Sequence, residues 1–386
     1  MDAAGIPYMI RPGKGPEGSV LDLLGQLIGS GGADALLLPF RVPSGDSFAW
    51  IMFSDVSLLK DAVPFPATMP VQGGRALRSL TRKEKGKLRI IALMRPCEIR
   101  AGMELSKLGQ VNTENLILAS YDCPGAVKLE DYVADPVSCD SAHSEMRSRG
   151  EPSGNARSAC STCVDFSMVD ADIHFGYFGI KDGGMLVLPG SPAGRALLEG
   201  LNLEEGRGLL PQWEAEISRL AERRAATREE TFRETAERIS GFDGMLATFS
   251  NCIGCHNCQS ACPICYCRLC YFDSEVSRTD PEALITAAEK RGGISIPPDR
   301  IMFHTGRLAH MSLSCVSCGQ CSDACPVSIP VADVFSFVAE RTQRAFDYKS
   351  GRSDGEALPL RRFLKNELDG VHEMVKDAES EASPNE

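Results

Sequence analysis

The stretch Asn251–Pro263, NCIGCHNCQSACP, contains four cysteines at the spacing C-x2-C-x2-C-x3-C-P, and Ser314–Pro326, SCVSCGQCSDACP, repeats that spacing. One such run is the ligand signature of a ferredoxin-type iron–sulfur cluster, and two runs in one chain predict a two-cluster domain. Paired zinc knuckles are the alternative, but zinc sites prefer two C-x2-4-C pairs and need neither the third cysteine nor the proline. The two runs therefore predict a chain that transfers electrons.

The two runs are expected to exchange one ligand. Three closely spaced thiolates surround one face of a cubane, while the cysteine before the proline ligates the other cluster. The first predicted 4Fe-4S centre is therefore held by Cys252, Cys255, Cys258 and Cys325. The second is held by Cys315, Cys318, Cys321 and Cys262.

Length and composition limit the other possibilities. The 386 residues suggest two or three domains, since a single core seldom exceeds about 250 residues. A net charge of −11 argues against nucleic acid as a partner. No apolar stretch reaches the roughly 20 residues of a membrane helix, and the first residues lack the pattern of a signal peptide. Sixteen cysteines at cluster spacings indicate a reducing cytoplasm rather than disulfides.

The part of the chain before the first run is predicted to be α/β. Short apolar runs predict buried strands at Ala35–Phe40, Phe48–Phe53, Leu88–Met94 and Leu116–Ala119, and a hairpin at Ile173–Phe178 and Met185–Leu188. Helical spacing is found at Val20–Ile28 and Gly74–Thr81. The mixed charges of Trp213–Ile239 predict a solvated connecting helix, and a later helix, Pro281–Arg291, is expected to pack on the cluster domain.

A glycine-rich loop lies near the N-terminus. Gly13, Gly15 and Gly18 form G-x-G-x-x-G ahead of a helical pattern. As a dinucleotide-binding fingerprint the motif is weak, because prolines interrupt the loop and Arg41 stands where an acid should meet the ribose. The other interpretation is a loop that lies against a flavin or a phosphate.

Four further cysteines predict a third cluster. Cys97 and Cys123 each follow a predicted strand, and Cys160 and Cys163 form a C-x2-C pair. Together they supply the four thiolates that a cluster takes. Cys139, in a predicted loop, is the spare cysteine and the alternative to Cys97, which would then be a small buried residue.

The cysteines after Pro263 have no assigned role. Cys265, Cys267 and Cys270 add C-x-C-x2-C. They could hold an additional metal centre with a fourth ligand from elsewhere, pack in the core, or displace Cys262 as a ligand. For His304 and His310 we expect packing or surface roles rather than ligation.

Four motifs together resemble one family. The family is that of the coenzyme F-420 hydrogenase/dehydrogenase beta subunits, and the similar motifs are RPCEIRA from Arg95, DCPG from Asp122 and ACSTCVDFSMVDADIHFGYFG from Ala159. A fourth motif, FHTGRLAHMSLSCVSCGQCSDACP from Phe303, resembles the C-terminal half of the formate dehydrogenase beta subunits. The resemblance covers about three quarters of the chain, and the order of the motifs is more specific than any one of them. Ferredoxin-dependent chlorophyllide reductases are similar to the same core, so the fold alone does not fix the substrate.

The resemblance implies a flavoprotein oxidoreductase subunit. Members of the family bind FAD beside a 4Fe-4S cluster, exchange a hydride with a soluble carrier and relay electrons to a partner. It implies the cluster role for Cys97, Cys123, Cys160 and Cys163, and it makes Gly15, Gly18, Arg95 and Glu98 the candidate cofactor-binding residues. No catalytic residue is predicted, since the sequence has no H-E-x-x-H motif or Walker loop.

The expected function is electron transfer between a hydride carrier, coenzyme F-420 or NAD(P)H, and a catalytic partner through FAD and 4Fe-4S clusters. The partner would be of the formate dehydrogenase, hydrogenase or heterodisulfide reductase type, with ferredoxin as a further candidate. The alternatives are a flavin-free iron–sulfur wire and a ferredoxin-dependent reductase of an organic substrate.

The predicted fold class is an α/β (α+β) flavin and iron–sulfur domain, a helical linker and a two-cluster 4Fe-4S ferredoxin-like domain. The expected limits are 1–205 for the first domain, 206–242 for the linker and 243–345 for the ferredoxin-like domain with its insert. Residues 346–386 turn polar and then acidic, which predicts a flexible tail.

Overall fold

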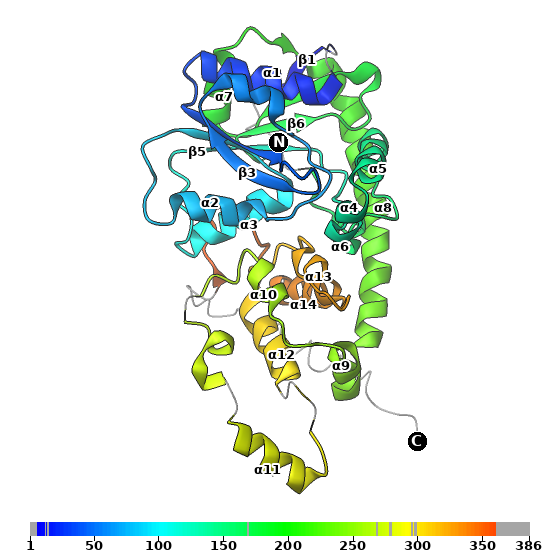
Figure 1. The fold of residues 1–386 in the computed structure, drawn as a ribbon. Helices are drawn as coiled ribbons and strands as arrows, with labels where there is room; N and C mark the ends of the chain where they lie inside the picture. Colours follow the sequence, from blue (N-terminus) through cyan, green and yellow to red (C-terminus); the bar gives the residue numbers. More distant parts are fainter. Residues whose placement is uncertain are drawn as a thin grey trace.

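The computed structural model describes residues 6–359 except 12, 14, 168, 169, 268, 278, 279, 295, 297 and 298. It has an α/β part and a smaller helical part that contains both cysteine runs, and one long helix runs beside the two (Figure 1). Within the described residues no helix has the length and apolar character needed to cross a bilayer. The predicted domain limits stay predictions, and most of the predicted tail, from residue 360 onward, lies outside the described residues.

The α/β part is built on one mixed sheet with the strand order β3-β2-β4-β5-β6-β7-β1-β8. Strands β2, β4, β5 and β6 are parallel, while β3, β7, β1 and β8 join by antiparallel pairing. Every predicted strand is confirmed, including the β6–β7 hairpin. The strands are β1 (Tyr8–Ile10), β2 (Ala35–Arg41), β3 (Phe48–Phe53), β4 (Ile90–Leu93), β5 (Leu116–Tyr121), β6 (Ile173–Gly176), β7 (Met185–Pro189) and β8 (Glu204–Glu205).

Helices cover both faces of this sheet (Figure 1). On one face lie α1 (Gly15–Gly29) and α7 (Pro192–Glu199), whose leucines join a core with the side chains of β5 and β6. On the other lie α2 (Gly73–Thr81) and α3 (Pro96–Lys107), whose core continues into the ferredoxin part. Because the central strands are mostly apolar, both faces of the sheet can be buried, as parallel strands require.

The dinucleotide reading of the glycine loop is wrong. A dinucleotide-binding unit needs its first strand inside a parallel sheet. Here β1 precedes the loop, and its two neighbours, β7 and β8, both run antiparallel to it. The loop therefore leads from an edge region of the sheet into α1.

The long helix α8 (Leu210–Arg238) confirms the predicted connecting helix, but not its solvation. Leu220 is buried in the core of the α/β part. Farther along, the ring of Phe232 packs edge-on against Phe337 of α14 (Val331–Ala345), with ring centroids 5.7 Å apart. The apolar residues of α8 thus join the two parts, while most of its charged residues face solvent and Arg224 is buried.

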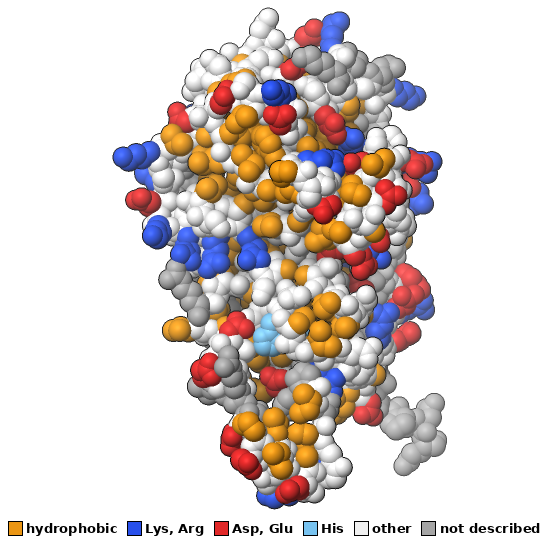
Figure 2. Space-filling model, viewed as in Figure 1, with side chains coloured by type: hydrophobic (Ala, Val, Ile, Leu, Met, Phe, Trp, Pro, Cys, Tyr) orange, Lys and Arg blue, Asp and Glu red, His pale blue; other side chains and the backbone are white. Residues whose placement is uncertain are grey.

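The ferredoxin part is helical. The helix predicted at Pro281–Arg291 is found there as α11, but it has no buried residue and extends away from the remainder of the molecule (Figure 1). The expectation that it packs on the cluster domain is wrong. Ile285 on this helix is exposed, and Figure 2 shows hydrophobic side chains on the surface of this projecting segment. The other helices here are α9 (Gly241–Phe249), α10 (Asn257–Ala261), α12 (Arg300–Met311) and α13 (Gln320–Asp323).

The first residues of the predicted tail are packed against α3. Arg100 donates from Nε and Nη2 to the carbonyl oxygen of Ser350, at 3.0 and 2.8 Å. Tyr348 and Leu358 are buried in a small core with Leu313. This segment therefore holds the helix that begins at Pro96 and carries Cys97.

Three more helices cover the edge of the sheet near the cysteine pair. They are α4 (Leu129–Ala134), α5 (Pro136–Arg149) and α6 (Ser158–Ser161). Two arginines of α2 reach across to the ferredoxin part: Arg75 donates to the carbonyl of Ser260, and Arg78 to that of Tyr266 at 3.1 Å. The two parts are therefore joined by hydrogen bonds as well as by a continuous core.

Candidate metal centres

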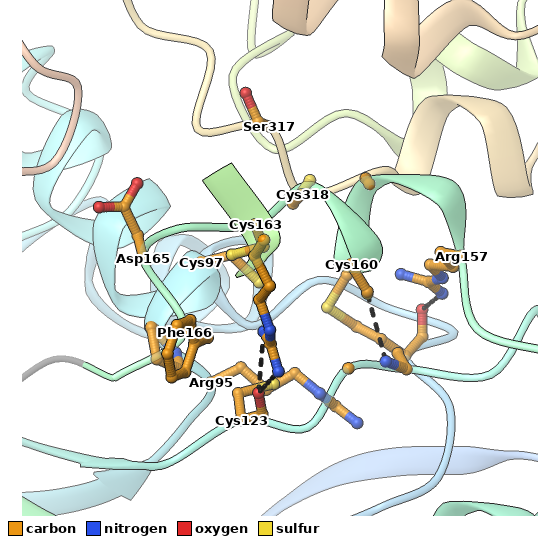
Figure 3. Close-up of a pocket in the computed structure, with 16 residues that line it drawn as sticks. Arg95, Cys97, Cys123, Arg157, Cys160, Cys163, Asp165, Phe166, Ser317 and Cys318 are labelled. Atoms are coloured by element: carbon orange, nitrogen blue, oxygen red, sulfur yellow. Dashed lines mark hydrogen bonds between the residues drawn. The ribbon is translucent and has the colours of Figure 1, made fainter. Parts of the chain in front are cut away.

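Four cysteines of the α/β part line one cavity of about 410 Å³ (Figure 3). Cys97 lies in the first turn of α3, directly after β4, and Cys123 follows β5. Because β4 and β5 are parallel neighbours, their carboxyl ends meet at the same edge of the sheet. Cys160 and Cys163 reach this edge from α6 and the turn after it. The structure thus brings together the four cysteines that the sequence suggested for a third cluster.

A fifth cysteine closes the same cavity from the ferredoxin part. Cys318 and its neighbour Ser317 line it opposite Cys97 and Cys163 (Figure 3). The pKa of the Cys97 thiol is raised mainly by burial and further by nearby Cys318. Two predicted ligand sets are therefore adjacent, with no polypeptide layer between them.

Three buried arginines lie among the thiols of this cavity. Arg95, Arg157 and Arg224 line it, and Arg157 pairs with Asp323 at 2.6 Å, both side chains being 3% exposed. Burial raises the pKa of Cys123 to about 12. Without iron the Cys123 thiol therefore keeps its proton, and cluster assembly would release it. Four thiols among buried guanidinium groups suit an anionic iron–sulfur cluster.

The two polar candidates from the RPCEIRA motif have different positions. Arg95 lines the cysteine cavity and is buried. Both carboxylate oxygens of Glu98 accept backbone N–H groups, from Arg95 and Gly73, each at 2.9 Å. Glu98 therefore joins the starts of α2 and α3, and it is not among the side chains that line the cysteine cavity.

The glycine loop connects to this region through one ion pair. Gly15 and Gly18 lie in the first turn of α1, and Glu17 between them pairs with Arg147 of α5 at 2.6 Å. The guanidinium of Arg147 lies 5.8 Å from the ring centroid of Phe65.

Aromatic rings continue from Phe65 toward the cysteines. Its ring centroid lies 4.6 Å from that of Tyr121 and 5.6 Å from that of Tyr177. Tyr121 is the last residue of β5, two positions before Cys123. The Nε atoms of Arg95 and Arg147 are buried and have no hydrogen-bond partner among the described residues. Aromatic faces with free cationic donors fit a flavin, whose ring is planar and whose phosphates are anionic.

In the ferredoxin part, a second cavity of about 440 Å³ is lined by cysteines of both runs. It contains Cys262 from the first run together with Cys315, Cys318 and Cys321 from the second. Cys265 is not among its lining residues; it donates a hydrogen bond to Cys262, which lowers the pKa of the Cys262 thiol. The grouping is the one that the exchanged-ligand pattern predicts.

The remaining predicted set surrounds Cys258. Burial and the neighbouring Cys252, Cys325 and Cys255 raise the pKa of Cys258, while Arg307 opposes this. The Sγ atoms accept hydrogen bonds, at 3.0 Å from Nη1 of Arg307 to Cys258 and at 3.4 Å from the amide of Ile329 to Cys325. Such bonds to sulfur orient the ligands and tune a cluster.

His304 has the packing role that we expected. Its ring stacks on Phe249 with the centroids 4.0 Å apart, and it is 1% exposed. In addition, Nε2 of His304 lies 3.4 Å from the Sγ of Cys252. Burial lowers the pKa of His304 to about 3, so this contact is made by a neutral ring.

Comparison with known proteins supports 4Fe-4S clusters in the ferredoxin part and finds similar redox subunits. Residues 248–329 match the 4Fe-4S dicluster domain family. The chain is 27% identical over 384 residues to the F420-dependent formate dehydrogenase 1 subunit beta of Methanococcus maripaludis, covering 89% of this chain and 92% of that one. It is 25% identical over 297 residues to the corresponding subunit of Methanocaldococcus jannaschii, covering 69% and 74%. The chain is thus similar to the beta subunits of F420-dependent formate dehydrogenases.

Both relatives are oxidoreductase subunits, and this chain carries the 4Fe-4S signature of an electron-transfer protein. A chain of the F420-reducing [NiFe] hydrogenase complex from Methanosarcina barkeri aligns with a TM-score of 0.42 and 13% identity, over 62% of this chain and 94% of that one. That likeness is too low to support an argument about the site.

One sequence-based prediction about the cysteines is wrong, and one group of residues at the candidate metal centres was not predicted from the sequence. Cys139 lies in helix α5 rather than in a loop, buried against Phe48 and Tyr132, and it is absent from the cavity of Cys97. The missed residues are the arginines, chiefly Arg307, which precedes the second run by eight positions. The only sequence signal for its contact with a cysteine is its position on α12, the helix that precedes the second run.

A second missed feature fixes Cys123. Asp122, directly before it, is buried and accepts hydrogen bonds from Nε1 of Trp213 at 2.8 Å and from the amide of Tyr177 at 2.7 Å. Nε2 of His174 lies 3.0 Å from its Oδ1. A buried carboxylate with several donors fixes its loop. The D of the DCPG motif therefore positions the cysteine beside it.

Proposed function

We propose that this chain transfers electrons between coenzyme F-420 and a catalytic partner subunit, through FAD, an N-terminal 4Fe-4S cluster and the two clusters of the ferredoxin part. The relatives are beta subunits of F420-dependent formate dehydrogenases. For this chain the coenzyme, the flavin, the third cluster and the partner belong to the proposal. A reducing cytoplasm would keep its cysteines available for iron.

The observation that carries the proposal is the position of Cys318, which lines the cavity of Cys97 and also the cavity of Cys262. Two clusters held there would share one wall. Electron transfer between centres is fast only over short distances, so adjacent cavities favour a continuous relay rather than separate sites. The third ligand set, around Cys258, is linked to the second through Arg307.

The flavin proposal is supported by the residues between the glycine loop and the cysteines. FAD, when bound, supplies the exchange between a hydride and single electrons. Arg147 is placed to pair with an anionic group, because its Nε is buried and has no hydrogen-bond partner in the part of the chain that the structure describes, while Glu17 contacts Nη1. Phe65 and Tyr177 offer aromatic surface for a planar ring.

The carrier proposal is supported by charge. A row of Lys and Arg side chains crosses the face shown in Figure 2, at the boundary between the α/β and ferredoxin parts. Coenzyme F-420 carries a phosphate and glutamates, so a basic surface would attract it in spite of the net charge of −11. The partner would dock on the ferredoxin part, where Cys255 is exposed.

The test begins with anaerobically purified protein. FAD released on heating, and bleaching of the bound flavin by reduced coenzyme F-420, would support the proposal. A panel with NADH, NADPH and reduced ferredoxin identifies the carrier. Protein that contains iron but no flavin would instead be an electron-transfer subunit without a flavin. If none of the four donors reduces the protein, the proposed reaction with a hydride carrier is wrong.

A matched pair of variants tests the third cluster. Cys163→Ser should lower the iron content by about four atoms per chain and separate flavin reduction from reduction of the partner. Cys139→Ser, which removes a buried cysteine outside the cavities described above, should leave both unchanged. Full iron and full partner reduction in Cys163→Ser would contradict the N-terminal cluster.

A further inference from the structure

Three cysteines lie outside the ligand sets described above, and they line a cavity of their own. Cys265, Cys267 and Cys270 surround about 350 Å³, and His310 from the last turn of α12 lines the same cavity. Its size is close to the 410 and 440 Å³ of the two other cysteine cavities. A packing role does not account for the group, because Cys267 is exposed.

We propose that this cavity holds an additional 4Fe-4S cluster, with Cys265, Cys267, Cys270 and His310 as its ligands. Thiolates are the usual ligands of such clusters, and imidazole replaces thiolate on some iron–sulfur centres. The histidine supplies the fourth ligand that the C-x-C-x2-C spacing lacks.

The arrangement of the donors favours a cluster over a single ion. Among the described residues no three His, Cys, Asp or Glu side chains converge closely enough to hold one metal ion. A zinc ion would need four donors about 2.0–2.3 Å from one point. A cubane binds its ligands through four separate irons, so donors spread around a cavity suit it better. The ferredoxin cysteines show the same spread, and their sequence is that of a cluster domain.

One polar group in the wall of the cavity has an atom without a hydrogen-bond partner among the described residues. Gln259 is 8% exposed and lines the cavity, and its Oε1 has no hydrogen-bond partner among the described residues. Its Nε2 lies 3.7 Å from the Sγ of Cys270. Arg307 lines the same cavity and brings a positive charge to the thiols. An unpaired buried polar atom is costly without a ligand, and the cation offsets the negative charge of bound thiolates.

The position of the cavity would connect the cluster to the relay. Cys265 lies within hydrogen-bond reach of Cys262, which lines the second ferredoxin cavity, so the two sets of ligands would be neighbours. Arg307 and Met311 line both cavities. With Cys267 at the surface, the added centre would be a branch that leads electrons from the second ferredoxin cluster to a second exit.

The test compares iron, sulfide and zinc per chain in anaerobically purified full-length variants. The double variant Cys267→Ser/Cys270→Ser should contain about four irons and four sulfides fewer than the unaltered protein. Cys139→Ser is the control and should keep all of its iron. The low-temperature EPR signals of the ferredoxin clusters should persist in both, which shows that the fold is intact.

A ligand exchange at His310 tests the proposal if the double variant fails to fold. His310→Cys should keep the full iron content but change the Mössbauer parameters of one iron, because thiolate replaces imidazole, while His310→Ala should weaken retention of that cluster. Equal iron and unchanged spectra in all His310 and Cys267 variants would overturn the proposal. Stoichiometric zinc in the unaltered protein, lost in the double variant, would overturn it as well.

Discussion

Nη1 of Arg307 lies 3.0 Å from the Sγ of Cys258, and the same guanidinium lines the cavity of Cys262 and Cys321. Arg307 is 3% exposed and lies over the rings of Phe303 and Phe335. One buried positive charge thus faces both predicted ligand sets of the ferredoxin part. Since a reduced cluster is more negative than an oxidised one, this charge stabilises the reduced state and raises the reduction potential.

Arg307→Gln should lower the potential of the cluster at Cys258. The loss of a charge-assisted hydrogen bond worth ~1–2 kcal/mol corresponds to a shift of roughly 50–100 mV for one electron. An EPR-monitored redox titration measures it. Arg341→Gln, on the exposed side of α14, is the control. Equal midpoint potentials in the two variants would show that Arg307 has a packing role only.

Arg147→Gln should reduce the flavin content and leave the iron content unchanged. Arg147 is the partly buried cation between the glycine loop and the aromatic rings, and loss of one charged contact weakens binding by about 10–100-fold. The ratio of flavin to protein after desalting is the measurement. Arg149→Gln removes a neighbouring arginine whose side chain is 70% exposed, and it should retain its flavin. Similar flavin ratios in both variants would place the flavin elsewhere.

Asp323→Ala should destabilise the junction of the two parts. It removes the partner of Arg157 and leaves a buried cation uncompensated, which costs about 3–5 kcal/mol. Anaerobic urea denaturation of the cluster-loaded protein measures the shift in midpoint. Glu151→Ala, which breaks contacts with the exposed Arg219 and Arg223, should cost less than ~1 kcal/mol. A smaller effect for Asp323 than for Glu151 would contradict the prediction.

Gly351→Ala should detach the segment after α14 from α3. Gly351 has φ +69°, and a Cβ there would lie 2.7 Å from the carbonyl oxygen of Arg100. Left-handed strain and overlap together should cost at least ~2 kcal/mol. Gly355→Ala has only Ser353 Oγ at 3.8 Å and should be neutral. Hydrogen exchange at Tyr348 would report the loosening, and equal protection in both variants would count against it.

The sequence was sufficient where local pattern decides the structure. The strands of the sheet are apolar runs buried on both faces, so composition marks them. Helix α11 has Pro281 at its first position and Gly292 just after its end, and both signals mark helix limits. The cysteines were recognised because cluster ligands follow fixed spacings.

Contacts between residues far apart in the chain could not be predicted from the sequence. Strands β1 and β8 have three and two residues, too few for a periodic pattern. Because α8 is rich in charged residues, the packing of Leu220 and Phe232 against the rest of the protein was not predicted from the sequence. Arg307 and Arg157 contact residues that are far away in the sequence, Cys258 and Asp323. No rule based on residue spacing predicts such contacts.

The exchanged position of Cys262 has a consequence for how the protein is made. This cysteine belongs to the first run, yet it lines the cavity of Cys315, Cys318 and Cys321. During synthesis Cys262 leaves the ribosome well before that second run, and the first run in turn waits for Cys325. With the predicted ligand sets, neither half of the ferredoxin part would complete its cluster alone, so we expect iron delivery to follow translation of both halves. A ribosome that stalls between the two runs would release a chain with thiols but without a finished centre.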